Sequence, residues 1–194
     1  LSPADGAMLG EAKVPGGGNL ALDHGQLAVA SAQSLSVVMQ AGEGERFLRE
    51  RLAADPSDPR RGLALVGLGR SWKRASLLLD GADAALAALG GADTPASAEV
   101  RQELLRTLLD ASLLAAIDAA DADRLLDLAQ RLAQTPEQRA ECLLCRAGRQ
   151  SKAGDTAAAA RTLAALLSDD AVARSLVRVD AARQVCAGIL ALQR

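Results

Sequence analysis

Aromatic side chains are almost absent from this sequence. They make up 1% of the 194 residues, as Phe47 and Trp72, and there is no tyrosine. Proteins that bind single-stranded nucleic acid stack bases on aromatic rings, and quaternary ammonium ligands are held in aromatic cages. The sequence has neither kind of platform. An excess of positive charge is also missing: 22 Lys and Arg face 24 Asp and Glu, for a net charge of −2. Both observations argue against a nucleic-acid-binding protein, which usually needs a basic face, so we expect no nucleic-acid partner.

Histidine and cysteine are scarce. A single histidine, His24, excludes a multi-histidine metal site and most histidine-based catalysis, and we expect it in a surface turn. Three cysteines are an odd number, which is not a disulfide framework. Cys142 and Cys145 have CxxC spacing, but they lie inside a helical pattern and no second pair could complete a zinc site. We expect both to be core or half-buried residues, and we expect no metal and no cofactor.

Long hydrophobic runs are missing as well. No run approaches the 18 residues of a transmembrane helix, and residues 1–10 lack the basic and apolar regions of a signal peptide. The chain begins at Leu1, which a processed terminus or a partial sequence would both explain. The compartment and the oligomeric state are left open.

A glycine-containing segment suggests a phosphate-binding loop, and aspartate clusters suggest a calcium site, but the neighbouring residues support neither. A phosphate-binding loop between Gly62 and Gly69 would need Lys and Ser or Thr after its second glycine, where Leu68 and Gly69 stand. The aspartates near Asp118 and Asp169 precede helical patterns, so they are predicted to cap helices rather than bind calcium.

The chain changes character near residue 42. Residues 1–42 are rich in glycine and contain short alternating runs, at 19–23 and 26–31, joined by His24 and Gly25. This pattern predicts a hairpin, with a further strand at 34–39 and a possible earlier one at 7–14. Residues 43–194 have the spacing of amphipathic helices.

Helix boundaries follow from capping residues and glycines. The predicted helices are 43–54, 60–68, 72–89, 95 to about 118, 121–133, 136–152, 156–167 and 171–192. Glycines 67 and 69 are expected to end the second helix, and Ser71 to cap the third. Thr135 and Gln138, with Pro136 between them, form a capping-box pattern. The helix at 171–192 is expected to cover the last open face of the domain.

A spacing of about 34 residues relates parts of the helical region. With that shift Asp121 falls on Asp155, and the apolar positions that follow align in register. Helix pairs that repeat at this interval form solenoids. The other interpretation is an unrelated all-α bundle in which the 34-residue spacing arises by chance.

The repeat resembles the tetratricopeptide repeat over roughly residues 43–170, although the usual first-helix aromatic is missing. The resemblance is carried by Gly154 and Asp155 followed by Ala159, Leu163 and Leu166, and in an earlier unit by Trp72, Ala75, Leu79 and Ala82. Segments 1–6, 18–20, 26–31 and 35–38 resemble the last blade of a PQQ-like β-propeller. The whole chain is therefore similar to the C-terminal part of a bacterial propeller protein with tetratricopeptide-like helices, whose parent could be exported or in the cell envelope.

The fold class implied is a mainly α solenoid of antiparallel helix pairs (43–194) after a short antiparallel β segment (1–42). The resemblance implies a non-enzymatic protein–protein interaction module with a groove lined by first helices. By repeat register the groove candidates are Arg60, Glu141, Leu144 and Lys152. A cofactor site would need a whole propeller and a docking tryptophan, so no PQQ is expected here. Two alternatives are the tail of a quinoprotein-like oxidoreductase and a self-associating helical bundle.

Overall fold

The structure is a computed structural model that describes residues 19–23, 26–30, 35–39, 41–90 and 94–176. Two compact units divide the chain, Leu1–Phe47 and Leu48–Arg194. In the first unit, β1 (Asn19–Asp23), β2 (Gln26–Ala30) and β3 (Leu35–Met39) pair antiparallel in the order β1-β2-β3. Asp23 pairs with Gln26, and Gln26 pairs with Met39. The possible strand at 7–14 and His24 lie outside the described residues, and the propeller-blade assignment stays a prediction.

The described part of the chain is mainly helical, as predicted. Helix α1 (Ala41–Ala54) spans the division between the units. Helix α2 (Pro59–Trp72) begins with Asp58 as N-cap, whose carboxylate accepts from Arg60 N at 3.0 Å, and α3 is Ala75–Leu89. The predicted boundary between α2 and α3 is wrong. Helix α2 runs through Gly67, Gly69 and Ser71, and ends where Lys73 adopts a left-handed conformation with φ 53°.

Close packing between helices explains why glycine does not end α2. A Cβ atom added at Gly62 would lie 2.6 Å from the carbonyl oxygen of Gly81, and one at Gly81 would lie 2.7 Å from the carbonyl oxygen of Gly62. At Gly69 the added atom would lie 2.8 Å from the backbone nitrogen of Leu78. These glycines allow the backbones of α2 and α3 to touch. Local sequence rules do not see this tertiary contact and interpret the same glycines as the end of a helix.

The long helix predicted from 95 to about 118 is two helices, which is a second correction. Helix α4 (Pro95–Leu108) ends before Asp110, and α5 (Ala111–Ala116) begins there. The Asp110 carboxylate accepts from the backbone nitrogens of Ser112 and Leu113, at 2.9 and 3.3 Å. This N-cap outcompetes continuation of the helix. Ala111, the first residue of α5, is exposed.

The remaining helices follow their capping signals. Helix α6 (Ala119–Leu132) is capped by Asp118, α7 (Pro136–Lys152) begins with the predicted capping box, and α8 is Thr156–Ser168. Helix α9 (Asp170–Ser175) is capped by Asp169. Only the start of the predicted helix 171–192 is described, because residues 177–194 lie outside the described part of the chain.

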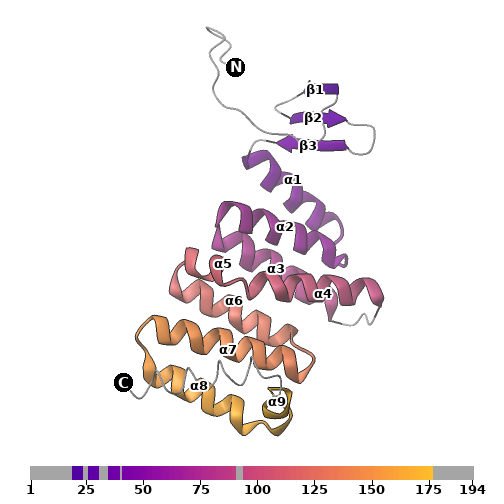
Figure 1. Cartoon of the computed structure of the whole chain (residues 1–194). Coiled ribbons are helices and arrows are strands. Elements are labelled where there is room, and N and C mark those ends of the chain that lie inside the picture. Colours follow the sequence, from indigo (N-terminus) through magenta and orange to yellow (C-terminus); the bar gives the residue numbers. More distant parts are fainter. Residues whose placement is uncertain (1–18, 24–25, 31–34, 40, 91–93, 177–194) are drawn as a thin grey trace. The chain divides into compact units, whose positions relative to one another are not determined.

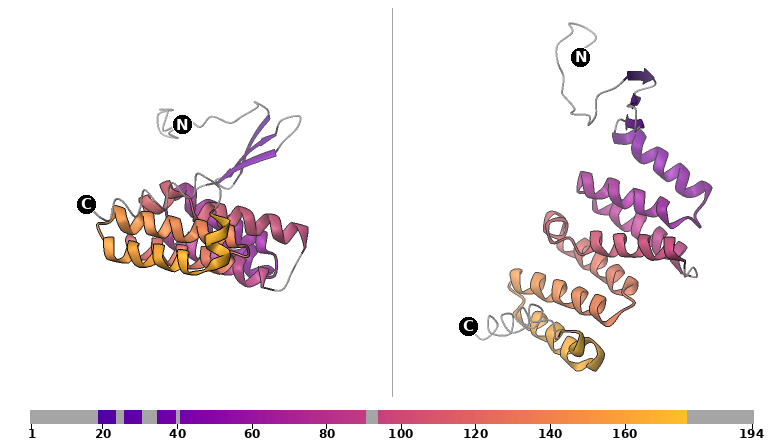
Figure 2. Two further views of the ribbon diagram at one scale, coloured as in Figure 1. Left: turned by 60° about the horizontal axis from the view of Figure 1, so that its bottom comes forward. Right: turned by 45° about the vertical axis from the view of Figure 1, so that its right-hand side comes forward.

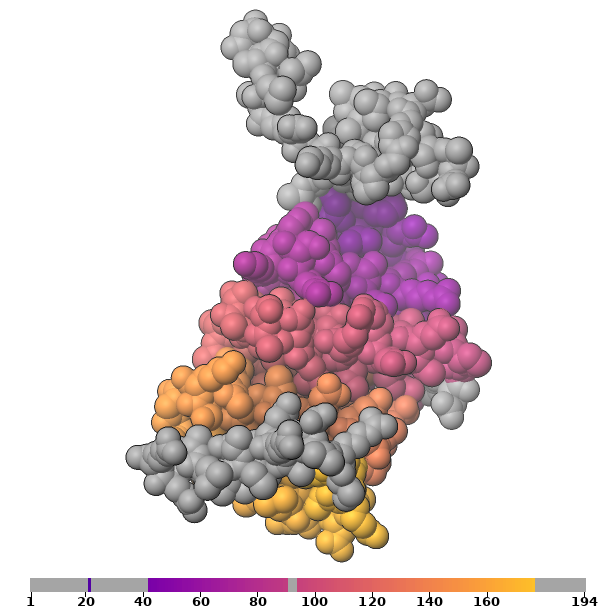
Figure 3. Space-filling view, in the orientation of Figure 1, coloured from indigo at the N-terminus to yellow at the C-terminus, as the bar shows by residue number. Residues whose placement is uncertain are grey.

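The helices of the second unit pack in solenoid-like succession (Figure 1). Three antiparallel pairs follow one another: α2 with α3, α4 with α6, and α7 with α8, the last side by side in both views of Figure 2. Neighbouring pairs meet where α2 contacts α4, α3 contacts α6, and α6 contacts α7. In Figure 3 the sequence colours therefore form bands. The largest cluster of buried residues runs from Val66 to Cys142, with α6 inside it.

The second helices of two pairs match at the predicted interval. Leu125, Ala129 and Leu132 of α6 are buried, and so are Ala159, Leu163 and Leu166 of α8. The caps do not match, because Asp155 caps α8 whereas Asp118, and not Asp121, caps α6. The first helices differ too, since α4 and α5 stand where α7 is continuous. The core spacing repeats while the helix ends do not.

Candidate partner-binding groove

A groove of about 620 Å³ lies among the first helices of the three pairs. It is lined by Arg70 from the end of α2, Gln138 and Glu141 from α7, and Gln102, Leu105, Arg106, Thr107, Leu109 and Asp110 from α4 and the turn that follows. Helices α4 and α7 both pack on α6. The groove therefore lies between two helices that share one neighbour.

Helical spacing selects the residues that α4 contributes. Gln102, Leu105, Arg106 and Leu109 follow one another by three, one and three positions, which places them on one face. Leu105 is 4% exposed and Leu109 is half-buried, so leucine forms the floor. Gln102 and Arg106 are exposed on its rim. This face combines an apolar base with polar side chains above it.

Asp110 lines the groove and holds two helices at once. One carboxylate oxygen caps α5, and the other accepts from Arg70 Nη2 on α2 at 3.1 Å. The Arg70 side chain is half exposed and the Asp110 side chain one-quarter exposed. The pair therefore links the first helix pair to the second, and it neutralises the Arg70 guanidinium.

Arg106 is neutralised in a similar way. Its Nη2 donates to both carboxylate oxygens of Glu103, one turn earlier on α4, at 2.6 and 2.8 Å. The hydrogen bonds to Glu103, followed by its negative charge, raise the pKa of Arg106 above its usual value. Both guanidinium groups at the groove are thus paired within the protein.

Gln138 has a fixed orientation because it belongs to the capping box of α7. Its Oε1 accepts from the backbone nitrogens of Gln134 and Thr135, at 2.8 and 3.2 Å, while Thr135 Oγ1 accepts from Gln138 N at 3.3 Å. The side-chain oxygen is committed to the start of the helix. What Gln138 presents to the groove is therefore its amide NH₂, a donor.

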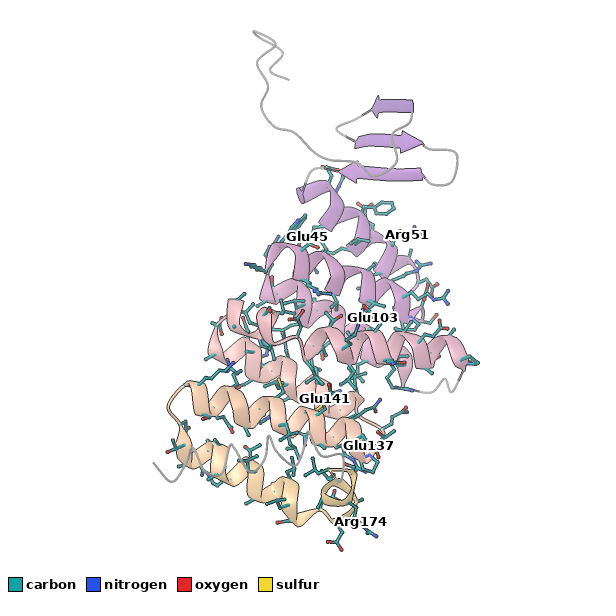
Figure 4. All side chains as sticks on the ribbon, viewed as in Figure 1. Glu45, Arg51, Glu103, Glu137, Glu141 and Arg174 are labelled. Carbon is teal, nitrogen blue, oxygen red and sulfur yellow. The ribbon has the colours of Figure 1, made fainter. Side chains whose placement is uncertain are left out.

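Glu141 lies one turn further along α7 and is exposed. Its carboxylate makes no hydrogen bond or ion pair that involves the described residues, in contrast to the charged groups opposite. Figure 4 shows Glu103 on α4 and Glu141 on α7, which are the first helices of two successive helix pairs. Glu141 thus brings to the groove a negative charge that no side chain in the described part of the protein compensates.

The two cysteines of α7 lie behind this face. Burial, and secondly the negative charge of Glu141, raise the pKa of the Cys142 thiol to about 11 and that of Cys145 in the same direction. Cys145 Sγ donates to the Leu109 carbonyl at 3.9 Å. Both are free thiols packed in or against the main core cluster, as expected of core residues.

Of the four groove candidates proposed from repeat register, the structure places Glu141 alone in this groove. Arg60 borders a separate hollow of about 210 Å³ near the start of α2. Leu144 is half-buried against the small cluster formed with α8 and α9, and Lys152 is exposed at the last residue of α7. These positions do not converge.

Sequence reasoning missed Arg70, Gln102, Arg106, Asp110 and Gln138 as groove residues. The signal available was the face of α4 described above, with two leucines and two polar residues in alternation. Using it would have required knowing that α4 ends near Leu108, since Asp110 lines the groove as the N-cap of the new helix that begins there.

Other kinds of site have no support in the part of the chain that the structure describes. No three His, Cys, Asp or Glu side chains there are grouped as metal ligands. None of the described helices combines the length and hydropathy needed to cross a bilayer. In comparisons with known proteins, no protein-family model matches the sequence, and no curated protein or solved structure is significantly similar to it.

Proposed function

We propose that this chain is a non-enzymatic interaction module whose groove between α2, α4 and α7 binds an extended segment of a partner protein. The observation that carries the proposal is the groove itself, which is formed by the first helix of each successive pair. In a solenoid, that arrangement presents one continuous binding face.

The lining has the chemistry of peptide recognition. Glutamine amides can hydrogen-bond a peptide backbone, and the leucine floor can cover apolar side-chain atoms. The resemblance of the helical region to tetratricopeptide-like proteins agrees with this assignment.

The proposal is tested by selection from a displayed library of random peptides of about twelve residues, using the full chain as bait. Recovered peptides are synthesised and titrated against the wild type and two variants. Gln102→Trp fills the groove from its rim. Gln130→Trp is the matched control, because Gln130 is exposed on α6 and does not line the groove.

We expect Gln102→Trp to weaken peptide binding at least about tenfold, or about 1.4 kcal/mol, and Gln130→Trp to leave it unchanged. Equal affinities for all three proteins would contradict the proposal. Failure to recover any peptide that binds more tightly than about 1 mM would do the same.

A further inference from the structure

We infer that the groove is selective for a basic segment, in which a Lys or Arg side chain of the partner pairs with Glu141 while Gln102 and Gln138 hydrogen-bond its backbone. This inference rests on the proposed function and deepens it by naming the chemistry of the peptide.

The charge balance of the groove points to a cation. Arg70 is paired with Asp110, and Arg106 is paired with Glu103. The remaining charged group of the lining is the Glu141 carboxylate, which no described residue neutralises. An incoming Lys or Arg would complete this third pair without disturbing the other two.

The same balance disfavours an anionic ligand. A phosphate or an acidic peptide would meet guanidinium groups whose positive charge is already offset by Asp110 and Glu103. It would also meet the negative charge of Glu141, which repels another anion.

The rest of the lining suits the stem and the backbone of a basic residue. Lys and Arg carry methylene stems that pack along apolar surface while the charged head stays in water. Leu105 and Leu109 provide such a surface beneath Gln102. Gln138 can act only as a donor there, because the capping box occupies its oxygen, so it selects a carbonyl of the partner's backbone.

The experiment compares charge variants at one position. The full chain and its variants Glu141→Gln and Glu141→Arg are titrated with N-acetylated, C-amidated peptides from the selection. Each peptide is made in three forms, with its basic residues kept, replaced by glutamine, or replaced by glutamate. Glu50→Gln is the control, since Glu50 is exposed on α1 and does not line the groove.

We expect the selected peptides to be enriched in Lys and Arg, and Glu141→Gln to weaken them about tenfold at low salt and less at high salt. Glu141→Arg should prefer the glutamate form, while Glu50→Gln should behave as wild type. Circular dichroism of each variant checks that it is folded.

Two failures are distinguishable. In the first, the selected peptides are not enriched in Lys and Arg, Glu141→Gln binds them as well as the wild type does, and Gln102→Trp does not bind them. This result would overturn the present inference and leave the proposed function standing. Peptides indifferent to Gln102→Trp as well would overturn both.

Discussion

Helices α2 and α3 contact each other through backbone, whereas α6 and α7 are joined at their edges by charged side chains. In the first contact, Gly62 and Gly81 meet with no space for a Cβ atom. In the second, Arg146 pairs with Asp127 at 2.5 Å, and Arg149 pairs with Asp123 at 2.9 Å. The comparison teaches that one solenoid-like array can use two packing strategies, one intolerant of added volume and the other dependent on charge.

The largest expected effect would break the glycine contact. Replacing Gly62 or Gly81 with alanine places a methyl group under 3 Å from opposing backbone, so the helices must separate. We expect a loss of about 3 kcal/mol in the free energy of unfolding, measured by urea denaturation. Gly67→Ala is the control: it lies on α2 in open space, and it should stabilise by up to about 1 kcal/mol. Equal effects at Gly62 and Gly67 would show that the backbones do not touch.

The charged contact is tested next at Arg149. Besides Asp123, its guanidinium donates to the Ala119 carbonyl at 2.7 Å, and its side chain is 24% exposed. Arg149→Met keeps much of the stem and removes these bonds, for an expected loss of about 1.5 kcal/mol. The difference between variant and wild type should shrink when the denaturation is repeated at high salt. Arg161→Met, at an exposed position of α8, is the comparison variant and should lower the free energy of unfolding less.

The start of α7 offers a third case to set beside the two helix contacts. A local capping signal, rather than a contact between helices, determines where this helix begins. Thr135→Ala removes half of the capping box and should lower the free energy of unfolding by about 1 kcal/mol. Thr135→Ser keeps the hydroxyl and should recover most of the loss. A serine variant as unstable as the alanine variant would point to the methyl group instead of the cap.

The last prediction concerns the Cys142 thiol, whose effect on stability is absent at neutral pH and appears only in alkaline solution. Burial raises the pKa of Cys142 from its ordinary 9.0 to about 11, so between these values the unfolded chain has lost a proton that the folded chain still holds. Stability contributed by this thiol is therefore complete below pH 9.0 and lost as the pH rises toward about 11. Chemical denaturation across that range should show the decline, and Cys142→Ala should show a smaller one. Parallel curves would mean that the thiol is not buried when folded.

The helices that could be predicted from sequence are those whose ends are set by local chemistry. Thr135 and Gln138 predict the start of α7, and Asp155 predicts the start of α8. In both helices, side chains a few residues away satisfy the free backbone N–H groups of the first turn. Gly69 and Asp110 were misjudged for the opposite reason. Their effects depend on α3 packing against α2 and on a competing cap, and neither is visible in a local window.

The groove was less predictable than the fold. Glu141 was reached through repeat register, but repeats that share core spacing do not share helix ends, so the register failed to bring Arg60, Leu144 and Lys152 to the same place. A groove between α2, α4 and α7 depends on how three helices are set against α6 and its neighbours. That placement comes from packing rather than from the residues of any one helix.

Helix α6 has a consequence for how the second unit opens. It contacts α3, α4 and α7, and Ala122, Leu125, Leu126 and Ala129 on it are all fully buried. In an array whose helices touch only near neighbours, local unfolding of the helices before α6 can affect the helices after it only through α6 itself. The amide hydrogens of α6 should then exchange with solvent last, when the unit unfolds as a whole, while α8 and α9 exchange through smaller openings at the end of the array.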